Sequence, residues 1–271
     1  MMRKQLAVVA LATIAAFGLA LSSRAQVLFS DAFNYSPGAL NSANTGGAWG
    51  IGTGNSGLTV VSGNLTYPGL YDTGGNEAQI ANGSAGTIGA AFANQTSGQV
   101  WISLLFDPTA ADSANNYFMA MNPGTSTPNG GSDAIDAYYY ASGKIEVRAN
   151  AAAATAGTGT ALTLNTVNLI VEEIDLTAKT ASLWVNPSSL TFANNGLTPT
   201  ATASISGITA TAVDDVGLKA QSSAGGPYLI DNVIVGQTWA DVTPVVPEPS
   251  TYLLVGTGLA MMLGFIRRRR S

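Results

Sequence analysis

Short runs of alternating or β-branched apolar residues recur along the middle of the chain, separated by turn-forming residues. In QVWISLLF (99–106), Val100, Ile102, Leu104 and Phe106 would line one face of a strand, because side chains alternate between the two faces of a sheet. Comparable windows are 58–61, 64–67, 117–121, 135–140, 144–148, 167–176, 180–185, 203–208, 213–219 and 228–235. No window of similar length keeps a clean helical period, so the pattern predicts an antiparallel β-sandwich.

One hairpin can be predicted in detail from this pattern. The segments 58–61 and 64–67 flank Ser62 and Gly63, which suit a tight turn between paired strands. We therefore expect these two segments to pair with each other.

The composition agrees with an all-β fold and excludes several kinds of chemistry. Charged residues make up only 10% of the chain, and small and turn-forming residues are abundant. The chain contains no Cys and no His, which excludes disulfides, zinc-thiolate sites, thiol nucleophiles and the commonest general base. We expect no catalytic residues and no cofactor. The stability of such a domain has to come from its core, and about 220 residues between the two ends suffice for one sandwich.

The charge is distributed unevenly along the chain. Seven of the eleven basic residues lie near the two ends, so the segment 27–246 keeps four basic against fifteen acidic side chains and carries −11. Phosphate backbones would repel such a surface, which excludes nucleic acid as an expected partner.

The first 25 residues have the three parts of a secretory signal peptide. Arg3 and Lys4 precede a continuous apolar stretch (6–21), and small residues at positions −3 and −1 precede a bond between Ala25 and Gln26. This order predicts export, with signal peptidase cleaving between Ala25 and Gln26.

The last 25 residues combine a Pro-rich motif, an uncharged stretch and four arginines. Pro247, Glu248 and Pro249 belong to a linker (243–250), and the uncharged residues 251–266 would form a helix of roughly 24 Å, close to the thickness of a bilayer core. The segment 251–271 is therefore predicted to be a transmembrane helix with a basic tail. The arginines that should hold its end in the cytoplasm are Arg267, Arg268, Arg269 and Arg270.

This order of elements closely resembles the PEP-CTERM sorting signal of Gram-negative bacteria. The resemblance implies that Pro247, Glu248 and Pro249 are recognised by a membrane-embedded exosortase, which removes the tail. The protein would then be an inner-membrane-anchored precursor that ends in the cell envelope, on the surface or outside the cell.

Between the two ends, the segment 26–242 resembles the concanavalin A-like (LamG-like) jelly-roll domains of exported bacterial proteins. The resemblance rests on LFSDAFNYSPGAL (28–40), IVEEIDLTAKTASLWVNP (170–187) and YLIDNVIVGQTWADV (228–242), which look like the opening strand, a central hairpin and the closing strand. It implies that the first and last strands pair, which would bring 29–33 close to 229–235.

The sequence Glu173-Ile174-Asp175 is the strongest candidate for catalysis. It resembles part of the Glu-x-Asp-x-Glu strand of laminarinase-type glycosidases, in which carboxylates on one face attack the substrate and donate a proton. Thr177 and Ala178 stand where the third carboxylate should be, and Glu172 points to the opposite face. The acidic residues are therefore expected to face solvent before a turn, and a glycosidase remains the alternative hypothesis.

Two further groups of residues suggest binding without identifying a site. Asp214, Asp215 and the loop from Asp72 to Glu77 could hold a structural calcium ion, although neither matches a calcium-loop spacing. Aromatic side chains could stack on sugar rings if they are exposed, whereas core packing is the more frequent location for any one of them. The aromatic candidates are Trp49, Tyr71, Tyr138, Tyr139, Tyr140 and Trp239.

Together these features predict an exported, exosortase-processed surface or matrix protein without catalytic activity. We expect its body to bind or contribute to extracellular polysaccharide. A structural or adhesive matrix component without a ligand is a further alternative.

Overall fold

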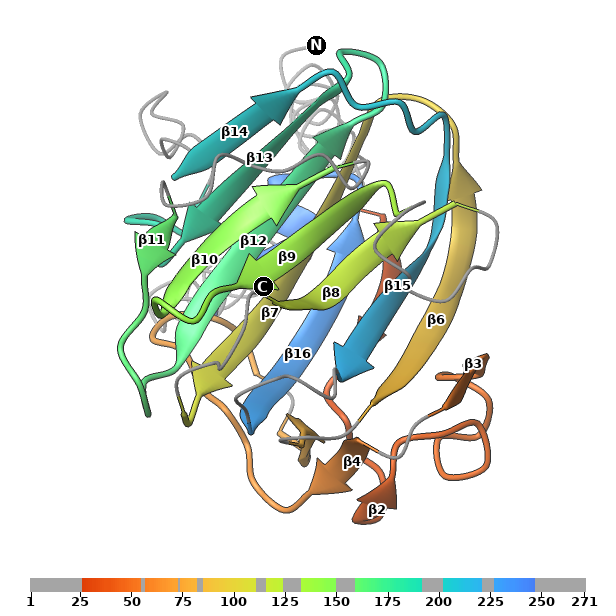
Figure 1. The fold of residues 1–271 in the computed structure, drawn as a ribbon, viewed down its shortest axis with the longest axis vertical. Coiled ribbons are helices and arrows are strands. Elements are labelled where there is room, and N and C mark those ends of the chain that lie inside the picture. The colour runs from red at the N-terminus through yellow and green to blue at the C-terminus, as the bar shows by residue number, and fades with distance from the viewer. Residues whose placement is uncertain are drawn as a thin grey trace, which may run out of the picture.

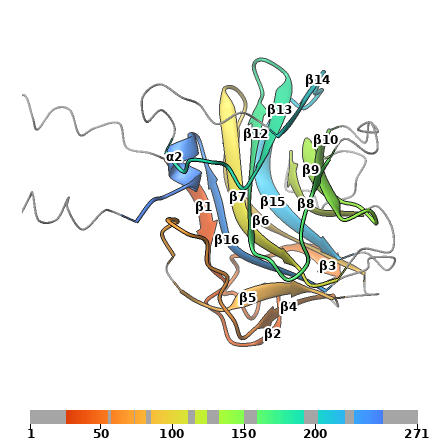
Figure 2. The same cartoon turned by 90° about the vertical axis from the view of Figure 1, so that its left-hand side faces the viewer.

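The computed structural model describes residues 26–54, 57–72, 74–81, 85–110, 116–123, 133–149, 159–191, 202–220 and 227–246. Within these ranges the chain folds into strands, with one short helix, α2 (Trp239–Val242), near the end. The strands form two sheets that face each other (Figures 1 and 2).

The larger sheet has nine antiparallel strands. Its spatial order is β14 (Ala203–Ser206), β13 (Thr180–Val185), β12 (Asn168–Asp175), β7 (Gln99–Pro108), β16 (Tyr228–Gly236), β5 (Glu77–Ile80), β4 (Leu58–Val61) and β2 (Gly38–Ala39). The ninth strand, β1 (Val27–Asp31), pairs with the second half of β16, while β5 pairs with the first half.

The smaller sheet has seven strands. Its order is β11 (Thr160–Ala161), β10 (Lys144–Arg148), β9 (Ile135–Tyr139), β8 (Asn116–Asn122), β15 (Val213–Ala220), β6 (Gly86–Gln95) and β3 (Ile51–Gly54). Strands distant in sequence are neighbours in both sheets, since β7 lies beside β16 and β15 lies between β6 and β8. The fold is an antiparallel β-sandwich of the jelly-roll kind, which confirms the predicted fold class.

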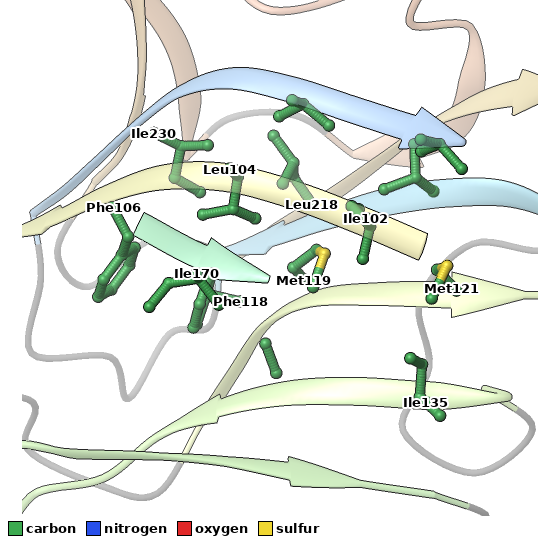
Figure 3. Packing of buried hydrophobic residues seen from close by; sticks show 14 of the residues in the cluster. Ile102, Leu104, Phe106, Phe118, Met119, Met121, Ile135, Ile170, Leu218 and Ile230 are labelled. Carbon is green, nitrogen blue, oxygen red and sulfur yellow. The ribbon is translucent and has the colours of Figure 1, made fainter. Parts of the chain in front are cut away.

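The main core fills the space between the two sheets (Figure 3). Ile102, Leu104 and Phe106 point into it from β7, as the alternation in QVWISLLF predicts. From the opposite sheet, Phe118 stacks on Phe106 with the ring centroids 4.3 Å apart. Burial of such large apolar side chains supplies most of the free energy that stabilises the sandwich.

A second apolar layer lies on the outer face of the larger sheet, beneath α2. Trp101, Trp184 and Trp239 contact one another there with ring centroids 5.2–5.7 Å apart. The Thr238 side chain accepts from the N–H of Asp241 while Asp241 accepts from the N–H of Thr238, which forms a capping box that begins the helix. Because β7 is covered on both faces, its sequence is apolar at nearly every position.

Several strand predictions are confirmed residue by residue. The predicted windows 144–148 and 180–185 coincide with β10 and β13, and the 170–187 hairpin is formed by β12 and β13. The first and last strands pair as expected, with Phe29 opposite Val235 and Asp31 opposite Val233.

The hairpin predicted at 58–67 is wrong. Leu58–Val61 pairs with Glu77–Ile80, and residues 64–67 form no strand. The reason is tertiary, because the N–H of Leu65 donates to the side chain of Asp231 at 3.0 Å and Leu65 packs into the layer beneath α2.

The two terminal segments lie mostly outside the described residues. Gln26 is described and exposed, whereas Ala25, Pro247, Glu248, Pro249 and the arginines Arg267, Arg268, Arg269 and Arg270 are not described. In the part of the chain that is described, no helix has the length and apolar character needed to cross a membrane.

Candidate functional site

The opening motif SDAFNY is organised around the side chain of Asp31, at the end of β1. Its Oδ1 accepts from the N–H of Phe33 at 2.6 Å, and its Oδ2 accepts from the hydroxyl of Tyr35 at 2.5 Å and from the indole N–H of Trp49 at 2.6 Å. Phe33 adopts a positive φ of 48°, which turns the chain back so that these donors converge. One carboxylate therefore fixes the course of the chain after β1.

The closing motif IDNV contains a bulge in β16. The register of β16 against β7 shifts between Asp231 and Ile234, and Asn232 adopts a positive φ of 49°. The two oxygens of Asp231 accept from the N–H groups of Leu65 and Asn232. Burial raises the pKa of Asp231 to about 7, against the opposing effect of these two hydrogen bonds. The bulge turns the Asn232 side chain toward Asp72, to which it donates at 3.3 Å.

A pocket of about 430 Å³ lies where these two motifs meet. We call it the Tyr71 pocket, because Tyr71 is half exposed at its wall. Its other lining residues are Val27, Ser30, Asp31, Ala32, Asn34, Tyr35, Asn232, Ile234, Asp241 and Pro244. The site therefore combines an accessible aromatic ring and apolar contacts with carboxylate, amide and hydroxyl groups.

Burial and hydrogen bonding together set the protonation states around this pocket. Burial raises the pKa of the Tyr35 hydroxyl, and the hydrogen bond and charge of Asp31 raise it further, so this hydroxyl stays a donor. For Asp72, burial raises the pKa, but hydrogen bonds from Asn64, Gly74 and Asn232 outweigh it and lower the value. At neutral pH Asp72, which lies behind Asn232 rather than in the pocket wall, is therefore ionised, whereas the Tyr35 hydroxyl in the wall stays neutral.

The predicted catalytic candidates occupy a different part of the molecule. Glu173 lies on the outer face of the larger sheet, opposite Trp101 on β7 and Ser182 on β13. Burial, followed by the charge of Asp175, raises the pKa of Glu173 to about 7. One oxygen of Asp175 accepts from the N–H groups of Thr177 and Ala178, at 2.8 and 2.7 Å. Asp175 therefore caps the turn between β12 and β13.

Glu172 points into the main core, on the opposite side of the strand from Glu173. It is fully buried, its cross-strand neighbours are Ile102 and Leu183, and neither of its oxygens has a hydrogen-bond partner. Burial raises its pKa to about 8, so the carboxyl is mainly neutral at pH 7. Glu172 is therefore protonated at neutral pH, and its burial keeps it away from any substrate.

The residues proposed for calcium do not form a cluster. Asp215 is buried on β15 and accepts from the amide of Asn122 at 2.8 Å, whereas Asp72 lies beside the Tyr71 pocket. Among the residues that the structure describes, no three acidic side chains are placed to hold a metal ion together.

The aromatic candidates separate into buried and accessible rings. Trp49, Tyr139, Tyr140 and Trp239 are at most 4% exposed, so four of the six pack inside the protein. Tyr71 is 50% exposed. Tyr71 is thus the candidate that the structure places in a pocket.

Tyr138 and Tyr140 share the outer face of the smaller sheet, as the alternation predicts. The guanidinium of Arg148 lies 4.1 Å from the ring centroid of Tyr138 and 5.4 Å from that of Tyr140. The Tyr140 hydroxyl donates to Glu146 at 2.8 Å, and Lys219 contacts Tyr117 nearby. These tyrosine rings and their hydroxyl groups therefore already interact with other side chains of the protein.

Sequence reasoning did not single out Asp31, Tyr35 or Asn232 as site residues. They lie in the opening and closing motifs, which were recognised only as strands. The pairing of β1 with β16 brings them together with Tyr71, which comes from a loop between β4 and β5.

Comparison with known proteins identifies the C-terminal end of the chain. Residues 245–270 match the family described as the PEP-CTERM protein-sorting motif, which confirms the resemblance found in the sequence. The motif indicates an exported protein that is processed by an exosortase. No curated protein matches the chain.

Solved structures with a similar fold are distant in sequence. A Trypanosoma rangeli sialidase in complex with the inhibitor DANA is 11% identical with a TM-score of 0.42, covering 69% of this chain and 28% of the sialidase. Lectin II from Ulex europaeus is 9% identical with a TM-score of 0.42, covering 78% and 98%. An alginate lyase mutant in complex with alginate trisaccharide is 10% identical with a TM-score of 0.46, covering 77% and 97%. Since each TM-score is below 0.5, the fold assignment rests on the strand pairing of this chain.

Proposed function

We propose that this exported, exosortase-targeted protein is a non-catalytic binding module whose β-sandwich holds extracellular polysaccharide in the Tyr71 pocket. In this proposal the precursor is anchored in the inner membrane by its C-terminal segment. Exosortase then transfers the body to the cell surface or the surrounding matrix. The observation that carries the proposal is the Tyr71 pocket itself.

The chemistry of the pocket suits a sugar ring. A pyranose presents an apolar C–H face that packs on an aromatic ring, and a rim of hydroxyls that needs both donors and acceptors. Tyr71 offers the accessible ring, Asn232 and Asn34 carry amides, and Asp31 offers a carboxylate at the pocket wall. Because the body is strongly acidic, we expect neutral or amino sugars to be preferred over polyuronates.

Replacing Tyr71 with alanine should weaken polysaccharide binding by roughly 5- to 30-fold, because one aromatic contact contributes about 1–2 kcal/mol to such complexes. The measurement is a pull-down and titration of the processed protein against a panel of neutral, amino and acidic polysaccharides. Leu164→Ala is the matched control, since Leu164 is also exposed but does not line the pocket.

Uniform failure of the native protein to bind the panel would contradict the proposal and favour a structural or adhesive matrix role. Equal binding by the Tyr71→Ala variant and the native protein would move the binding site elsewhere.

A glycoside hydrolase is the second candidate, favoured by one observation. The pKa of Glu173, which burial raises to about 7, is typical of a carboxyl that donates a proton near neutral pH. If this role is real, the processed protein should release reducing sugar from a β-glucan, and Glu173→Gln should abolish the release. Binding without turnover across the panel would reject the hydrolase.

A further inference from the structure

The last described residues of the chain are hydrogen-bonded to the body beside the Tyr71 pocket. Val245 forms a β-bridge with Leu70, the carbonyl of Pro244 accepts from the N–H of Tyr71 at 2.6 Å, and the N–H of Val246 donates to the carbonyl of Gly69 at 3.1 Å. The chain is therefore bonded to the body as far as Val246, the residue before the Pro-Glu-Pro sequence, so the first two residues of the matched sorting motif (245–270) lie on the body. Of the predicted linker 243–250, the described residues up to Val246 are thus bonded to the body rather than free.

Exposed apolar side chains gather around this point. Five large apolar side chains are exposed among the described residues. Four of them are Val27, Tyr71, Val245 and Val246, with 48%, 50%, 41% and 53% of their surface accessible. We call these four residues the exit patch. Val27 and Tyr71 line the pocket, while Val245 and Val246 continue the patch along the segment that leads to the tail. Exposed apolar groups gathered in this way indicate a contact surface.

The length of chain beyond the patch limits how far the patch can lie from a membrane that the predicted C-terminal helix spans. Only 247–250 separate Val246 from the uncharged segment that begins at Thr251. Five extended steps of chain reach at most about 17 Å, and the headgroup layer occupies roughly 5–8 Å of that distance. The predicted signal peptidase site, between Ala25 and Gln26, also lies within two positions of Val27 in the patch. If residues 251–266 span the membrane as predicted, the short connection keeps this face of the body close to the bilayer.

We propose that the lipid bilayer covers the exit patch and the mouth of the Tyr71 pocket while the sorting tail is intact, and that exosortase cleavage uncovers them. This inference rests on the proposed membrane anchoring. It makes ligand binding depend on processing, so that a precursor in the inner membrane does not bind polysaccharide before delivery. The acidic charge of the body opposes binding to anionic lipid, so contact is lost once the tether is cut.

The absence of cysteine from the chain allows a direct test. Tyr71→Cys places one thiol in the patch, and Ser142→Cys places one in the exposed turn between β9 and β10, on the side of the sandwich opposite α2 and β1 (Figure 2). The full chain is reconstituted into phosphatidylethanolamine–phosphatidylglycerol vesicles and treated with a membrane-impermeant maleimide. Labelling at 71 should be at least about tenfold slower in vesicles than in the processed protein, whereas labelling at 142 should not change.

A spacer variant separates tethering from other causes of protection. Insertion of about ten Gly and Ser residues between Val246 and Pro247 adds roughly 17 Å of flexible chain and should restore labelling at 71 while the protein still floats with the vesicles. Equal labelling at 71 with and without the tail, or protection that survives the spacer, would overturn the inference. Failure of the full chain to float with the vesicles would instead reject the anchoring on which it depends.

Discussion

Replacing Glu172 with leucine is expected to raise the free energy of unfolding, and to raise it far more at pH 8.5 than at pH 4.5. The carboxyl is fully buried between the sheets and neither oxygen has a hydrogen-bond partner. A leucine of similar volume removes the desolvation cost and adds apolar contacts with Ile102 and Leu183.

The pH dependence follows from the pKa of this group in the two states. Burial raises the pKa of Glu172 from 4.5 in the unfolded chain to about 8 in the folded protein. The folded state therefore binds more protons between these values, and the stability that this group contributes below pH 4.5 is lost as pH rises toward 8. Between pH 4.5 and pH 8.5 the loss amounts to roughly 4 kcal/mol, and it should be absent from the variant.

Denaturant unfolding of the native protein and the variant at both pH values measures this difference. Glu173→Gln is the matched control, because Glu173 lies on the same strand but is partly exposed, and its effect should be smaller. Part of the pH dependence should persist in both variants, since burial also raises the pKa of Asp136 to about 9 and that of Asp231 to about 7. If the free energy of unfolding changes with pH in the same way for the native protein and for Glu172→Leu, the Glu172 carboxyl is not the source of the pH dependence.

Replacing Asp31 with alanine is expected to destabilise the protein by about 3 kcal/mol or more. The substitution leaves three donors without their acceptor: the N–H of Phe33, the Tyr35 hydroxyl and the indole N–H of Trp49. Phe33 and Trp49 are fully buried, and an unpaired buried donor costs about 1–3 kcal/mol. The same change should weaken polysaccharide binding, because Asp31 lines the Tyr71 pocket.

Asp31→Asn is the control for this substitution. Asparagine keeps one acceptor oxygen and the shape of the side chain, so its loss of stability should be smaller than that of Asp31→Ala. Chemical denaturation monitored by the fluorescence of the tryptophans, Trp49 among them, measures both variants. A loss below about 1 kcal/mol for Asp31→Ala would contradict the role of Asp31 in organising the opening motif.

The strands that could be predicted from the sequence are those in which large apolar side chains alternate with polar ones, or in which large side chains occupy most positions. In β12, Ile170 and Ile174 face the core, and the period of two already places Glu172 with them and Glu173 on the other side. In contrast, β6 (GTIGAAFANQ) was not predicted, because small residues carry little periodicity. A Cβ at Gly89 would lie only 3.2 Å from Ile51 on the paired strand β3. Glycine at this position is therefore explained by the close approach of β3, which the local sequence does not show.

The segment 64–67 shows why one local prediction was wrong. Its residues have the pattern of a strand, and Ser62 and Gly63 have that of a turn. The backbone of Leu65 nevertheless bonds to Asp231, which is 166 positions away in the sequence. The residues around Leu65 give no indication that its backbone will bond to Asp231.

The sequence by itself determined what is encoded in consecutive residues: the sorting motif at 245–270 and the alternation that gives most strands of the sandwich. Local order suffices for both, because a sorting signal is read as a linear segment and a strand is a repeat of two residues. Only the tertiary structure decided the location of the pocket and its distance from the tail. Asp31, Tyr71 and Asn232 come from three separate segments, and the pairing of β1 with β16 and the bridge from Leu70 to Val245 bring them to one place.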